Sequence, residues 1–173
     1  MLKKIAVAFT ILILALTGVA YLLPAQVPVE RSIVINKAPA DIFPLINSWQ
    51  RFNEWSPWYS LDPKAVYERS GPDTGVGATH SWRGNSDVGV GKTTITQSTP
   101  ERRVDIRLEF EGMPTSNYWL TLTPEGNSTK VVWHMDANMG NNPISRWFGL
   151  AMDGMIGADY EKGLNKLKEI AEK

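Results

Sequence analysis

The sequence predicts an α+β protein in which a curved antiparallel sheet wraps around a long C-terminal helix, with one transmembrane helix before the domain. Three patterns in the 173 residues support this prediction. Residues 5–23 carry no charge, apolar and polar residues alternate through much of 65–139, and apolar residues recur every three or four positions after residue 143. Periods of two and of about 3.6 residues are typical of half-buried strands and of amphipathic helices, respectively.

The N-terminal segment is long enough to cross a bilayer. Residues 5–23, IAVAFTILILALTGVAYLL, follow Lys3 and Lys4. At about 1.5 Å per residue, a helix of this length matches a hydrocarbon core of roughly 30 Å. We therefore expect residues 1–23 to form a membrane anchor, and the two lysines favour a cytoplasmic N-terminus with the domain on the extracytoplasmic side. The alternative is a signal peptide cleaved near residues 18–20, which would release a secreted or periplasmic domain.

The domain begins after a short linker. Residues 24–28, PAQVP, contain two prolines, which end the first helix and favour extended backbone. Residues 29–36 are rich in β-branched side chains and predict the first strand. Pro39 begins a short helix that Pro44 breaks or kinks. Residues 49–59 concentrate large aromatic rings among turn-forming residues, and we expect this stretch to be a loop.

About six further strands fill the middle of the chain. Residues 103–111 provide the clearest one, because their apolar residues alternate with charged residues. The predicted strands are residues 66–70, 78–83, 90–97, 103–111, a strand containing 118–122, and 131–139. A long helix follows, with Asn142 as its N-cap and Pro143 in its first turn. Consecutive strands most simply form an antiparallel sheet, on which this helix buries its apolar stripe.

The order of elements and several motifs resemble the START-like, or SRPBCC, superfamily, most closely its bacterial polyketide cyclase/dehydrase-like members. The motifs are VERSIVINKAPADIFPLI, RFNEWSPW, GVGATHSWRGN, VGVGKTTI, YWLTLTPEGNSTKVVWHM and YEKGLNKLKE. The similarity covers residues 29–173 and implies the helix-grip fold. It also implies a ligand-binding domain with an internal cavity for an apolar or amphipathic small molecule. No residue in these motifs is a catalyst common to the superfamily, so the resemblance implies no particular reaction.

The composition argues against several classes of function. Lys and Arg number 18, as do Asp and Glu, and this zero net charge disfavours nucleic-acid binding. With no cysteine and only two histidines, we expect no disulfide, metal site or cofactor. The stretch VGVGKTT (88–94) lacks the first glycine of a phosphate-binding loop, because Ser86 occupies that position, and no helix follows it. We expect its glycines to permit a bulge or bend in the sheet.

We expect aromatic and methionine side chains to line the cavity. His80 shares strand phase with Trp82 and faces the concave side, where it would orient a ligand or act as a general base. His134 is out of phase with Trp133, and we expect it to face solvent. The expected lining residues are Trp55, Trp58, His80, Trp82, Phe110, Tyr118, Trp133, Met135, Met152 and Met155. The methionines suit varied ligands but would also fill a core, and Trp55 and Trp58 would form either a structural plug or a gate.

Three functions are compatible with these expectations. The first is a membrane-tethered domain that binds a lipid-like small molecule, with the bilayer as its partner through residues 5–23. The second is an enzyme of the cyclase, dehydratase or hydrolase kind that uses His80, the one catalytic candidate. The third is a structural or partner-binding domain with a filled core.

Overall fold

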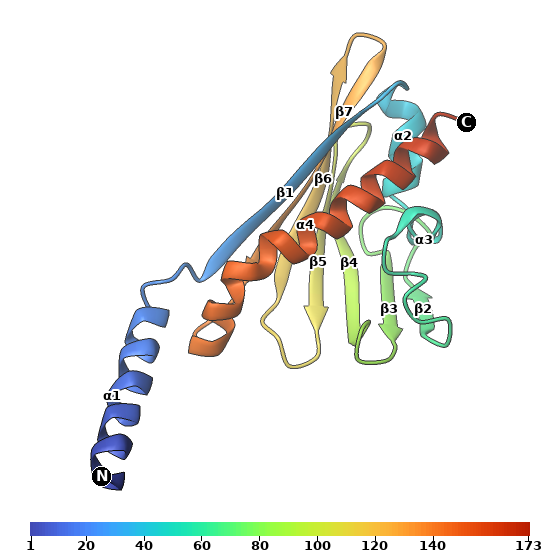
Figure 1. Cartoon of the computed structure of the whole chain (residues 1–173). Coiled ribbons are helices and arrows are strands. Elements are labelled where there is room, and N and C mark those ends of the chain that lie inside the picture. The colour runs from blue at the N-terminus through green and yellow to red at the C-terminus, as the bar shows by residue number, and fades with distance from the viewer.

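The computed structural model describes residues 1–173 and contains one antiparallel sheet with a long helix packed on it. The elements in chain order are α1 (Leu2–Ala20), β1 (Gln26–Ile35), α2 (Pro39–Ile46), α3 (Trp49–Trp55), β2 (Val66–Ser70), β3 (Thr79–Arg83), β4 (Val90–Thr99), β5 (Arg103–Phe110), β6 (Ser116–Glu125), β7 (Ser128–Asn138) and α4 (Pro143–Ala171). The strands are ordered β1-β7-β6-β5-β4-β3-β2. α4 crosses one face of the sheet, hereafter the inner face, and α2 and α3 lie beside it (Figure 1). The helix-grip fold is confirmed.

β1 begins earlier than the sequence indicates. Gln26, Val27 and Pro28, which were expected in the linker, pair with Asn138, Ala137 and Asp136 of β7. A proline is tolerated at this place because β1 is an edge strand of the sheet. The direct consequence is a connection of only a few residues between α1 and the sheet.

The aromatic stretch from Trp49 is a helix, so the prediction of a loop is wrong for residues 49–55. Trp49, Phe52 and Trp55 are spaced by three residues, and all three are buried. This spacing places them on one side of a short helix, where each contributes a large apolar area to the core. Pro44 does not break α2 at once, because that helix continues to Ile46.

The glycine-rich stretch does not form the expected bulge. The register irregularity of β4 lies further along, between Ile95 and Gln97. Gly91 instead pairs regularly with Trp82, and the Trp82 ring lies directly over it. A Cβ at Gly91 would overlap that ring, so this glycine makes room for a tryptophan on the inner face.

α4 begins and packs as its sequence indicates. The Asn142 side chain accepts a hydrogen bond from the Ile144 N–H at 2.9 Å and so caps the helix. Tyr160, Leu164 and Leu167 are buried against the sheet. Arg31 of β1 adds a polar clamp, because it contacts carboxylates of α4 on either side of Gly157, whose lack of a side chain leaves room for the guanidinium.

His134 shows how the outer face of the sheet differs from expectation. His134 lies on that face, but its side chain is only 16% exposed, so the prediction of a solvent-facing histidine is wrong in part. The imidazole stacks on Trp119 with ring centroids 4.1 Å apart. It also hydrogen-bonds with Glu30 and Asp136 at 2.9 and 3.1 Å. Its neighbours on the adjacent strands thus cover it.

α1 projects away from one end of the domain, with the chain's N-terminus at its far tip (Figure 1). It has a mean hydropathy of 2.0 and is long and apolar enough to cross a membrane, as a signal sequence would also be. Arg146 of α4 connects it to the domain by donating hydrogen bonds to the carbonyl oxygens of Tyr21 and Leu23.

Candidate functional site

The space between the inner face and α4 is occupied by stacked aromatic rings. The Trp133 ring of β7 lies parallel to the Tyr160 ring of α4, with centroids 3.9 Å apart. Trp55 and Trp58 each meet Trp133 in a T-shaped arrangement, with ring centroids 5.3 and 5.7 Å apart. α4 approaches this closely because residue 163 is glycine: a Cβ there would lie 2.9 Å from the Trp133 ring. We call Trp55, Trp58, Trp133 and Tyr160 the tryptophan cluster.

A second aromatic group surrounds His80 on β3. The His80 side chain is buried and stacks between Tyr67 of β2 and Trp49 of α3, with centroid distances of 5.3 and 5.8 Å. Trp82, two residues along β3, lies 6.0 Å from the imidazole. We call Trp49, Tyr67, His80 and Trp82 the histidine cluster. In this cluster the His80 imidazole and the Tyr67 hydroxyl group can both form hydrogen bonds.

Phe52 joins the two clusters into one interior. Its ring meets Trp49 at 5.5 Å and Trp133 at 6.2 Å, both edge to face. A continuous aromatic lining therefore runs from β2 and β3 at one side of the sheet to β7 and α4 at the other. Such a lining presents large rigid apolar surfaces with a few polar atoms among them.

Three buried polar atoms in these clusters have no hydrogen-bond partner within the protein. They are the Tyr67 hydroxyl, His80 Nε2 and Trp133 Nε1. The other interior indoles are satisfied, because Trp49, Trp55, Trp58 and Trp82 donate to Ala78 O, Leu45 O, Asp159 Oδ2 and Val88 O. Burying a polar group without a partner costs roughly 1–3 kcal/mol, so such groups are rare in folded proteins. These three atoms make the interior the candidate functional site.

The titratable rings of this interior are uncharged at neutral pH. Burial, together with the positive charge of Arg69, its cross-strand neighbour, lowers the pKa of His80 from 6.5 to about 4. Burial also raises the pKa of Tyr67, Tyr118 and Tyr160 above their ordinary value. A neutral imidazole and neutral phenols both donate and accept hydrogen bonds, which suits the polar end of a mostly apolar molecule. Arg69 is exposed and contributes the one positive charge next to His80.

The structure places most of the predicted lining residues in this interior. Tyr118 and Met135 are buried with the tryptophan cluster, Phe110 meets the Trp82 ring edge to face at 5.4 Å, and Met152 packs against the core. Met155 is the exception, because 53% of its surface is exposed and it lies outside the interior. Four members of the interior were not predicted from the sequence, namely Trp49, Phe52, Tyr67 and Tyr160.

Two signals could have identified the missed residues. Trp49 and Phe52 precede Trp55 by six and three residues, which is helical spacing. Tyr160 precedes Leu164 by four residues and so belongs to the same buried stripe of α4. Tyr67 left no comparable signal, because its place beside His80 depends on how β2 and β3 pair.

The interior contains no acid–base pair. The side chain of His80 makes no hydrogen bond to a carboxylate, and its lowered pKa makes it a weak base at neutral pH. No group of three or more His, Asp or Glu side chains lies close enough to hold a metal ion. The geometry therefore supports binding through shape and hydrogen bonds better than it supports proton transfer.

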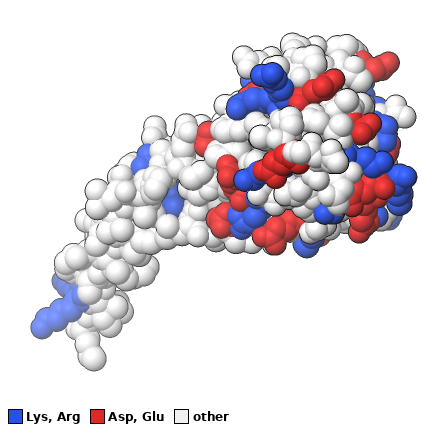
Figure 2. Space-filling view, turned by 90° about the horizontal axis from the view of Figure 1, so that it is seen from above, with Lys and Arg blue, Asp and Glu red and all other residues white.

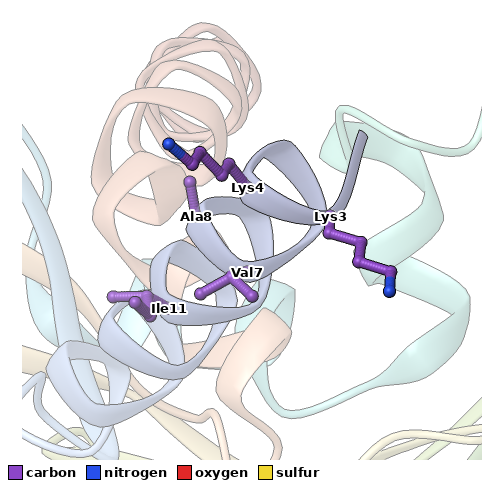
Figure 3. Close-up of a pocket in the computed structure, with 5 residues that line it drawn as sticks. All are labelled: Lys3, Lys4, Val7, Ala8 and Ile11. Carbon is purple, nitrogen blue, oxygen red and sulfur yellow. The ribbon is translucent and has the colours of Figure 1, made fainter. Parts of the chain in front are cut away.

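Two surface recesses lie along α1 and not in the interior. One, of about 340 Å³, is lined by the N-terminal turns of α1, where Lys3 and Lys4 extend to different sides of the helix (Figure 3). It is the bare side of a single helix, open to its surroundings. The other, of about 300 Å³, lies between α1 and the start of α4.

Comparison with known proteins identifies the domain. Residues 26–172 match the family model described as polyketide cyclase / dehydrase and lipid transport. No curated protein matches the sequence significantly.

Solved structures with low sequence identity share the fold. Protein CV1439 from Chromobacterium violaceum superposes with a TM-score of 0.62 at 12% identity, over 85% of this chain and 99% of that one. A protein from Thermobifida fusca gives 0.63 at 17% identity, over 83% and 92%. The Aha1 dimer from Colwellia psychrerythraea gives 0.57 at 18% identity, over 82% and 96%. The chain thus belongs to the polyketide cyclase/dehydrase and lipid transport family, within the START-like (SRPBCC) superfamily.

Proposed function

We propose that this chain is a membrane-anchored domain that binds a lipid-like, hydrophobic or amphipathic molecule between the inner face of the sheet and α4. Its family includes lipid transport in its description, and its interior is lined with aromatic rings. The ligand's apolar part would lie among the tryptophan cluster and Phe52. Its polar part would meet the histidine cluster, with Arg69 as the nearest positive charge.

One observation carries this proposal: the buried and unpaired Tyr67 hydroxyl, His80 Nε2 and Trp133 Nε1. In a domain whose interior served only as a stable core, unpaired polar atoms at these positions would lower the free energy of unfolding and serve no purpose. A ligand with polar atoms at either side of the interior would satisfy them. The rings would separate to admit it, since the stacked clusters occupy the same space.

The anchor is α1, which would cross the bilayer with Lys3 and Lys4 on the cytoplasmic side. Its side chains are exposed along nearly its whole length, as expected for a helix whose surroundings are lipid. The domain would then lie on the extracytoplasmic side, close to the membrane because so few residues separate α1 from β1. Cleavage of this segment as a signal peptide would give the same domain free in the same compartment.

Native mass spectrometry of the full-length chain, released from detergent micelles, tests the proposal. We expect either a co-purified adduct of discrete mass or saturable one-to-one binding of added oleic acid, used as an amphipathic probe. Absence of an adduct, together with oleic acid binding that never saturates, would contradict the proposal. That result would favour the domain with a filled core.

A further inference from the structure

The first half of α4 exposes a stripe without charge. Each residue of the stripe lies three or four positions from another, so that all share one side of the helix. They are Ile144, Trp147, Phe148, Ala151, Gly154, Met155 and Ala158. All seven are exposed, including 78% of Ile144 and 47% of Phe148. At about 1.5 Å per residue the stripe is roughly 21 Å long. Large exposed apolar patches of this kind mark interaction surfaces.

The second half of the same helix is different. The stripe continues with Lys162, Asn165, Lys166 and Glu169, which are exposed and polar or charged. Leu164 and Leu167 on the other side are buried against the sheet, as in an ordinary amphipathic helix on a water-soluble domain. One continuous helix thus has a water-facing half and a half whose exposed side is apolar.

The apolar half lies next to α1. The Trp147 indole donates a hydrogen bond to the Leu16 carbonyl oxygen at 3.2 Å, and Pro143 and Ile144 line a recess together with Ile13 and Thr17 of α1. The loop between β5 and β6, with Met113 65% exposed, packs beside the residues that precede α4. Figure 2 shows charged side chains gathered over the part of the domain away from α1, while the part that adjoins α1 is nearly all white.

From these observations we infer that the exposed stripe of α4, residues 144–158, lies in the outer boundary of the bilayer that α1 crosses. This inference rests on the proposed membrane anchoring. A bilayer fits better than a protein partner because the stripe begins at the level of Leu16, within the last turns of the anchor. Amphipathic helices enter the headgroup boundary with an apolar face that contains Trp and Phe, and Trp favours that depth.

The contact would fix how the domain stands on the membrane. The opposite side of the same helical segment, which includes Met152 and Ile156, packs against the core of the proposed binding interior. One segment of α4 would therefore separate bilayer from interior by the width of a single helix. A ligand passing between the two would have no long path through water.

Site-directed spin labelling of the full-length chain in phospholipid nanodiscs tests this inference. The chain has no cysteine, so single substitutions give unique labels. The test positions are Ile144→Cys and Phe148→Cys on the stripe. Ile11→Cys reports on α1, while Val76→Cys, an equally apolar exposed position, and Asn165→Cys, on the second half of α4, are the controls. Collisions with oxygen, enriched in lipid, and with a water-soluble nickel chelate distinguish the environments.

The expected result is a high ratio of oxygen to nickel accessibility at positions 11, 144 and 148, and a low ratio at positions 76 and 165. A low ratio at 144 and 148 with a high ratio at 11 would overturn the inference and leave the anchor intact. A low ratio at 11 as well would overturn both. Loss of access to both reagents at 144 and 148, with spin–spin broadening, would also overturn the inference, since it would place a second copy of the chain on the stripe.

Discussion

The two aromatic clusters of the interior have similar rings but different hydrogen bonding. In the tryptophan cluster the Trp55 indole N–H is satisfied by Leu45 O and the side chain is 1% exposed. In the histidine cluster Tyr67 and His80 also stack, with ring centroids 5.3 Å apart, yet the Tyr67 hydroxyl and His80 Nε2 have no partner. Ring size and burial are therefore similar in the two clusters, whereas the unpaired polar atoms favour the histidine cluster as the polar part of the proposed site. Trp133 shows that the tryptophan cluster contains one such atom as well.

The largest effect is expected for Trp55→Ala, which removes a fully buried side chain of the tryptophan cluster whose indole N–H has a hydrogen-bond partner. Large-to-small substitutions of this kind cost about 3–5 kcal/mol, because transfer energy is lost and a cavity is left. Thermal or urea unfolding of the full-length chain in detergent measures the loss. Trp119→Ala, on the outer face, is the control and should cost less. If the two variants lost the same free energy of unfolding, Trp55 would not be the tightly packed core residue described above.

The next effect is the pH dependence contributed by His80. Its folded pKa is lowered from 6.5 to about 4, so between these values the unfolded chain binds more protons than the folded chain. Stability should therefore fall as pH drops from 6.5 and stop falling from this source near pH 4. The total is about 3 kcal/mol at 1.36 kcal/mol per pKa unit.

Unfolding measured across this pH range in the wild type and in His80→Phe tests that expectation. The variant should lose most of the slope between pH 6.5 and 4. A wild-type slope that persists unchanged in His80→Phe would show that other groups carry it and that His80 is not desolvated as described.

A smaller effect is expected for Gly91→Ala, which disturbs the histidine cluster without removing any of its atoms. The new Cβ would overlap the Trp82 ring and meet the Glu109 carbonyl oxygen at 3.0 Å. Overpacking of this kind costs about 1–3 kcal/mol. Gly154→Ala on α4 is the matched control, since nothing lies within 4 Å of that Cβ. If Gly91→Ala left the stability measured by the same unfolding assay unchanged, that result would contradict the close approach of Trp82.

Much of the fold was predictable because its signals are local. The alternation in 103–111 depends only on which side chains face water, and β5 (Arg103–Phe110) reproduces it almost residue for residue. Asn142 and Pro143 mark the start of α4 through the chemistry of a helix end. The short helix α3 was missed because its three buried aromatic residues form less than two turns of helix, too few for a clear period.

The site was less predictable because it depends on long-range arrangement. The position of Tyr67 beside His80 follows from the register in which Tyr67 pairs with Trp82 and Arg69 with His80. Met152 and Met155 are three residues apart on α4, yet one packs on the core and the other is exposed, because helix orientation decides between them. Whether an indole N–H finds a partner depends on single carbonyl positions, which no sequence period encodes.

The most direct test of the proposed binding interior is the double substitution Tyr67→Phe with Trp133→Phe, examined by native mass spectrometry and by unfolding on the same sample. It removes two unpaired polar atoms while keeping aromatic rings at both positions. We predict that adduct or oleic acid occupancy falls strongly in the double variant and also in Tyr67→Phe alone. In that single variant the unfolding midpoint should not fall, because only the hydroxyl group is removed, whereas Trp133→Phe also removes buried volume. Wild-type occupancy in the double variant, or saturable binding absent from both proteins, would contradict the account.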